Sequence, residues 1–133
     1  MIRISKASSN NVCITLTEKT TVTDPTYLFS FKHPESGEIQ NFIAFDRSLY
    51  TDRYNEFTIV ETSTNPDNTQ GEVTLQYEGY WNYIIYAQTS DSNLDPNNAD
   101  EIVEKGKVYV IPTSQTYNAP NTSIYDTINT FNG

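Results

Sequence analysis

The sequence predicts an all-β protein: an Ig-like or jelly-roll-type antiparallel β-sandwich of about seven strands with an extended C-terminal arm. Short segments in which apolar and polar residues alternate recur along the chain, and this is the pattern of strands with one buried face. Turn residues separate these segments at short intervals, and residues 1–111 contain no long amphipathic helical pattern. Packing two sheets face to face is the usual way for such strands to bury their apolar sides.

The first half of the chain contributes three of these strands. Alternation over residues 12–17 predicts a half-buried strand, and residues 27–31 and 41–45 repeat the pattern. The connection over residues 33–38 contains Pro and Gly, which is typical of a hairpin loop.

The second half contributes four more strands, at residues 56–61, 73–77, 80–87 and 107–111. Residues 80–87 are apolar on both faces, so we expect this segment to be the central strand, with Trp81 in the core. The aromatic residues on regular strands are expected to fill the core: Tyr27, Tyr77, Trp81, Tyr83 and Tyr109.

The chain divides into a β-sandwich domain at residues 1–111 and an arm at residues 112–133. The arm carries one formal charge but retains several apolar and aromatic side chains. Disordered tails are usually rich in charge and poor in such residues, so we expect the arm to order by packing on a partner. Its candidate interface residues are Tyr117, Ile124, Tyr125, Ile128 and Phe131.

A second candidate interface is the connection over residues 46–54, which holds two of the three arginines. Tyrosines outside regular strands are better placed for binding than those in the core, and Tyr and Arg are both enriched at interfaces. The candidates in this connection are Arg47, Tyr50, Arg53 and Tyr54.

The net charge of −9 is unevenly distributed along the chain. Residues 1–53 hold six basic and six acidic side chains, whereas residues 54–133 hold two basic and eleven acidic ones. Such a charge repels phosphate backbones, so we expect no nucleic-acid partner. The acidity either attracts a basic protein surface or maintains solubility, and the sequence leaves both interpretations open. The sequence predicts no signal peptide and no membrane span.

The residues needed for common catalytic and metal sites are scarce. The chain has one histidine, His33, expected in an exposed turn, and one cysteine, Cys13, expected to be buried and inert. Nucleophilic catalysis of the Ser/His or Cys/His type depends on histidine, and a structural zinc site needs four ligands. We therefore expect a protein that is not an enzyme and has no cofactor.

Three segments resemble the small virion structural proteins of tailed bacteriophages, especially crAss-like phages that infect gut Bacteroidetes. They read WNYIIYAQTS at residues 81–90, SNLDP at 92–96 and IVEKGKV at 102–108. Further matches are LTEKT at 16–20, YLF at 27–29 and DRYNEF at 52–57. The resemblance covers roughly residues 1–111 and leaves the arm outside.

The resemblance implies a non-enzymatic β-sandwich component of a virion that is assembled in the cytoplasm of the bacterial host. We expect an auxiliary or decoration protein of the capsid, bound to the major capsid protein, to other virion proteins or to copies of itself. A position at the head–tail junction or in a fibre is an alternative. A further alternative, from a different class, is a glycan-binding β-sandwich module that uses exposed aromatic residues.

Overall fold

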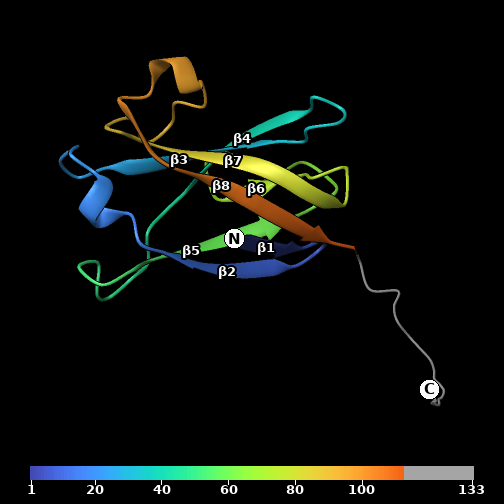
Figure 1. Cartoon of the computed structure of the whole chain (residues 1–133), viewed down its shortest axis with the longest axis horizontal. Helices are drawn as coiled ribbons and strands as arrows, with labels where there is room; N and C mark the ends of the chain where they lie inside the picture. Colours follow the sequence, from blue (N-terminus) through green and yellow to red (C-terminus); the bar gives the residue numbers. More distant parts are fainter. Residues whose placement is uncertain (113–133) are drawn as a thin grey trace, which may run out of the picture.

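The computed structural model describes residues 1–112, which form two β-sheets packed face to face (Figure 1). The strands are β1 (Ile2–Ser5), β2 (Ser9–Ile14), β3 (Thr26–Lys32), β4 (Ile39–Ala44), β5 (Asn55–Glu61), β6 (Glu72–Val73), β7 (Gly79–Gln88) and β8 (Glu101–Ile111). Two 3-10 turns, η1 (Thr17–Lys19) and η2 (Pro96–Asn98), interrupt the connections. The predicted all-β sandwich is confirmed, and the described residues contain no helix that could span a membrane.

The larger sheet has the strand order β1-β8-β7-β3-β4, and the smaller sheet has the order β2-β5-β6. As predicted, β7 is an inner strand, paired antiparallel with both β3 and β8. Its inward residues Trp81, Ile85 and Ala87 are fully buried. Strands β3 and β4 form the predicted hairpin, which the backbone N–H of His33 closes by donating to the carbonyl oxygen of Glu38 at 2.9 Å.

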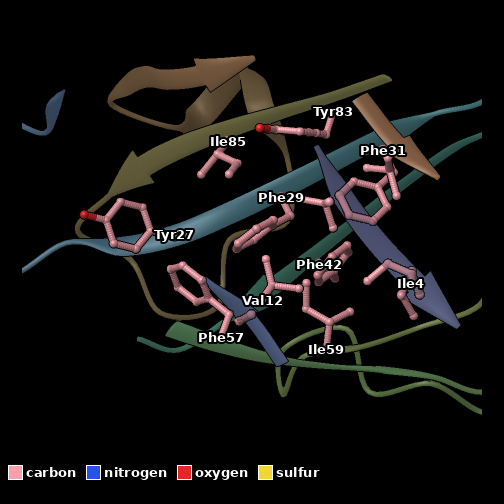
Figure 2. Packing of buried hydrophobic residues seen from close by; sticks show 14 of the residues in the cluster. Ile4, Val12, Tyr27, Phe29, Phe31, Phe42, Phe57, Ile59, Tyr83 and Ile85 are labelled. Carbon is pink, nitrogen blue, oxygen red and sulfur yellow. The ribbon is translucent and has the colours of Figure 1, made fainter. Parts of the chain in front are cut away.

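Aromatic rings from both sheets fill the centre of the sandwich (Figure 2). Phe29 of β3 stacks on Phe42 of β4 with 5.2 Å between ring centroids. Phe57 of β5 meets Phe29 edge-to-face at 5.1 Å, which joins the two sheets. These are favourable geometries for aromatic pairs and add to the stabilisation that burial alone provides.

The sequence pattern did not reveal β1, and two strand pairings are parallel rather than antiparallel: β1 with β8, and β5 with β6. Strand β1 has only four residues, of which Ile2 and Ile4 are buried. Glu61 stabilises the turn that follows β1: its carboxylate accepts the N–H groups of Ala7 at 2.8 Å and Leu75 at 2.9 Å. The turn joins the two sheets, so this buried carboxylate connects them.

Four expectations about single side chains were wrong. Cys13 is exposed, because Val12 faces the core and the next residue of a strand must face away. His33 is buried, since its ring stacks on Tyr77 at 4.6 Å and packs against Trp81 at 5.2 Å. Tyr77 is 39% exposed, because it covers His33 from outside instead of entering the core. Tyr109 is only partly buried, on the outer side of β8.

Candidate functional site

The connection between β4 and β5, residues 45–54, displays a set of exposed apolar and basic side chains. Leu49 is 87% exposed, Tyr50 57% and Phe45 41%. This segment contains four of the interface candidates named from the sequence: Arg47, Tyr50, Arg53 and Tyr54. Both arginines are exposed, Tyr54 is partly buried, and the rings of the two tyrosines lie 6.5 Å apart. We call this segment the 45–54 loop.

Asp46 anchors the start of the loop. One of its carboxylate oxygens, Oδ1, accepts the backbone N–H groups of Ser48 at 2.9 Å and Glu56 at 3.1 Å. The other, Oδ2, accepts the side-chain amide of Asn55 at 2.6 Å. The backbone N–H of Arg47 donates to the carbonyl oxygen of Glu56 at 2.7 Å. These bonds hold the two ends of the loop side by side.

Asn55 connects this anchor to the interior of the protein. Its Oδ1 accepts the backbone N–H groups of Leu16 at 2.6 Å and Thr17 at 3.2 Å. Its Nδ2 donates to Asp46 and to Oγ1 of Thr17 at 3.0 Å. The residue is fully buried, so its donors and acceptors must find protein partners. An asparagine satisfies this because its amide carries both an acceptor and two donors.

The tip of the loop is held by bonds to its own backbone. The carbonyl oxygen of Tyr50 accepts the N–H groups of Arg53 at 2.9 Å and Tyr54 at 3.1 Å. The hydroxyl oxygen of Ser48 accepts the N–H of Tyr50 at 3.0 Å. A segment constrained in this way loses less conformational entropy on binding than an open loop of the same length. The loop therefore presents its side chains in a preorganised form.

A cavity of about 470 Å³ lies beside the anchor, between the 45–54 loop and the segment containing η1. Its lining offers polar and apolar surface in about equal parts and consists of Thr17, Thr20, Val22, Asp24, Pro25, Tyr27, Asp46, Thr51 and Asn55. Burial raises the pKa of Tyr27, a hydrogen bond with Thr20 opposes the rise, and the charges of Asp46 and Glu101 add to it. The phenol is thus neutral at physiological pH. Because both oxygens of Asp46 bind donors of the anchor, this carboxylate serves structure rather than proton transfer.

The one histidine, His33, is held by hydrogen bonds within its own hairpin. Its Nδ1 lies 2.8 Å from the hydroxyl of Ser36 and also accepts the backbone N–H of that residue at 3.1 Å. The hydroxyl oxygen in turn accepts the N–H of Glu38 at 3.2 Å. These bonds close the β3–β4 hairpin. Within residues 1–112, no group of three or more His, Cys, Asp or Glu side chains is arranged to hold a metal ion.

Two exposed apolar residues of the 45–54 loop were not among the predicted interface residues: Phe45 and Leu49. The position of Phe45 was available from alternation, because Phe42 and Ala44 face the core and Phe45 must then face away. The exposure of Leu49 had no signal in the sequence. The predicted contacts of the arm lie outside the described residues: Tyr117, Ile124, Tyr125, Ile128 and Phe131.

Comparison with known proteins gives little that bears on function. No protein-family model matches the chain, and no curated protein matches it. A crystal structure from Bacteroides vulgatus ATCC 8482, provisionally described as a glycoside hydrolase, is similar with 12% identity and a TM-score of 0.45. The similarity covers 86% of this chain but only 17% of that protein. At this level it carries no argument about activity.

Proposed function

We propose that this protein is a non-enzymatic structural component of a bacteriophage virion, an auxiliary or decoration protein that docks on the capsid. Its partner is the major capsid protein, and the 45–54 loop is the docking element. The resemblance of residues 81–90, 92–96 and 102–108 to phage virion proteins supports the assignment to a virion. The preorganised, exposed loop is the observation that supports a docking role.

The composition of the loop fits a protein interface. Leu49 and Tyr50 are exposed apolar side chains at its tip, and the arginines Arg47 and Arg53 flank them. Interfaces typically place a few aromatic or apolar anchors at the centre and charged groups at the rim. A leucine that is almost entirely exposed gains apolar burial when a partner covers it, at about 25 cal/mol per Å².

The same loop fits an alternative partner at the head–tail junction or in a fibre, since its chemistry selects a protein surface and not a position in the particle. In either position, the arm at residues 112–133 is proposed to add contacts to a neighbouring subunit.

The proposal is tested by co-sedimentation of the protein with purified particles of the phage that encodes it. We expect Leu49→Asp to weaken attachment at least tenfold, because it places a charge in the centre of the interface. Ile102→Asp is the matched control, since Ile102 is 53% exposed on β8, remote from the loop in sequence. Equal attachment of the two variants, or absence of the protein from purified particles, would contradict the proposal.

A further inference from the structure

The outer face of the five-stranded sheet carries a charge opposite to that of the whole protein. Alternation and strand register place four of the eight basic residues at outward positions: Arg3, Lys32, Lys105 and Lys107. No outward position of these five strands, all of which the structure describes, holds an acidic residue. We call this surface the basic face. In a chain of net charge −9, the basic face is a local surface whose positive charge favours an anionic partner.

A groove of about 380 Å³ runs across the basic face. This volume is within the range of pockets that bind small molecules, roughly 300–1,000 Å³. Its lining combines amide, hydroxyl and ammonium groups with apolar surface: Ser30, Lys32, Ile39, Asn41, Asn82, Ile84, Tyr86, Pro96 and Asn97. The residues come from β3, β4, β7 and the η2 turn, so four separate parts of the chain form one site.

The η2 turn forms one wall of the groove. Figure 1 shows η2 above the five-stranded sheet, on the side away from β2 and β5. The side chain of Asp95 caps the turn by accepting the N–H of Asn97 at 3.0 Å, and Pro96 occupies its first position. Gln88 supports the connection, because its amide donates to the carbonyl oxygen of Asn93 at 2.9 Å and accepts from the side-chain amide of that residue at 2.8 Å.

Asn41 lines the groove and contains a buried hydrogen-bond acceptor. Its Oδ1 is buried and has no hydrogen-bond partner in the described part of the chain. A buried acceptor without a partner is costly, so native proteins rarely retain one without a reason. Asn41 lies opposite Ser30 in the sheet, and Ser30 lies opposite Ile84. The side chain of Asn41 lines the groove beside Ser30, although its Oδ1 is itself covered by protein atoms.

We propose that the groove binds an anionic polysaccharide, of the class that contains uronic acid. The hydroxyl groups of a sugar both donate and accept, so they match Ser30, Asn41 and Asn82. The carboxylate of one sugar unit would accept a hydrogen bond from the ammonium group of Lys32. The carboxylate of the next sugar unit would accept one from Lys107, whose ammonium group also donates to Oδ1 of Asn82 at 3.1 Å.

Apolar surface on the same face suits the C–H faces of sugar rings. Ile84 and Tyr86 line the groove, and the rings of Tyr80 and Tyr109 form a pair beside it, 4.9 Å apart. Tyrosine is suited to such contacts because it combines an apolar ring with a polar hydroxyl. The site lies on the face of the sheet rather than at its edge, so an extended peptide could not bind there by adding a strand.

The test uses calorimetry with oligosaccharides from polygalacturonate, alginate and hyaluronan, and with dextran and polyglutamate as comparison ligands. We expect saturable binding of at least one uronate oligosaccharide, weaker binding as salt rises, and no comparable binding of dextran or polyglutamate. Lys32→Gln should weaken this binding about tenfold, because it removes a charge-assisted hydrogen bond to the carboxylate of the ligand. Lys6→Gln is the matched control, because Lys6 lies in the turn between the two sheets.

Asn41→Leu separates binding from stability. It removes the amide and keeps a side chain of similar size. Because Oδ1 of Asn41 has no hydrogen-bond partner within residues 1–112, thermal stability should be unchanged or higher, while oligosaccharide binding weakens because the groove loses a polar group. If Asn41→Leu lowers the melting temperature and leaves binding intact, Asn41 is structural and the proposal is wrong. Binding of polyglutamate in place of uronates would identify an acidic peptide as the partner and overturn the saccharide assignment. The saccharide proposal is also wrong if dextran binds as strongly as the uronates, or if no uronate oligosaccharide binds.

Discussion

The substitution Asn55→Asp gives a direct test of the anchor under the 45–54 loop, because it changes one group and almost no volume. In the native protein, Nδ2 of Asn55 donates to Oδ2 of Asp46 at 2.6 Å. The substitution replaces this donor with a second carboxylate oxygen. Two carboxylates at this distance repel each other unless they share a proton.

The magnitude follows from burial. Asn55 is 1% exposed, so the new charge would be buried beside a like charge. Leaving a buried charge uncompensated typically costs about 3–5 kcal/mol, and we expect a loss of unfolding free energy of that size at pH 7. Asn55→Ala instead leaves the N–H of Leu16 without its acceptor, at a cost of about 1–3 kcal/mol.

The sign of the pH dependence distinguishes the two variants. In Asn55→Asp, the folded state retains a shared proton to a higher pH than the unfolded state, whose aspartate titrates near about 4. The deficit relative to the native protein is therefore small in acid and grows as the pH rises above this value. For Asn55→Ala the deficit involves no new titrating group, so it should change much less over the same range.

Urea unfolding at several pH values, followed by the fluorescence of the buried Trp81, measures both deficits. The native protein supplies the reference at each pH, which removes the contribution of all unchanged groups. If the deficit of Asn55→Asp is independent of pH, or smaller than that of Asn55→Ala at pH 7, then the bond to Asp46 does not anchor the loop as described.

Two further predictions concern the core. Trp81→Ala should lower the unfolding free energy by about 3–5 kcal/mol, because it removes a fully buried ring and its hydrogen bond to the carbonyl oxygen of Tyr77. Circular dichroism during urea unfolding measures this loss, and an unchanged unfolding midpoint would contradict the prediction. Burial, with the charge of Glu104 and a hydrogen bond to it, raises the pKa of Tyr83 to about 12. Unfolding free energy should therefore fall as the pH rises from about 10 to 12, because the unfolded state loses this proton first. Tyr83→Phe should lose less unfolding free energy over the same interval.

Much of the sandwich could be predicted because alternation records which face of a strand is buried. Strand β5 follows this rule over its whole length, whereas Leu28 of β3 and Ile43 of β4 are buried on the opposite face of their sheet. Strand β7 was recognisable as an inner strand from apolar residues on both faces. Strand β1 escaped because four residues are too few to show a period, and its partner β8 lies at the other end of the domain. A parallel pair of this kind leaves no hairpin signal between its strands.

The side chains that were misjudged have their environments set by residues distant in sequence. His33 lies in a turn, where exposure is the usual state, yet Tyr77 and Trp81 cover it. Nothing near His33 in the sequence records that contact. Cys13 is the opposite case, since the alternation with Val12 already predicted an outward side chain, and the general preference of cysteine for burial led to the wrong expectation.

The distribution of charge shows why the groove could not be predicted. Along the chain, residues 54–133 hold all of the excess acid, and Lys105 and Lys107 look isolated among acidic neighbours. In the sheet, the register places Lys107 opposite Asn82, and Asn82 opposite Lys32. Strand pairing thus converts scattered lysines into one basic face, while their acidic neighbours in sequence lie elsewhere. The same pairing brings Asn41 next to Ser30, so that amide and hydroxyl groups and a positive field occur at one place, and their coincidence is the reason to seek an anionic, hydroxyl-rich ligand there.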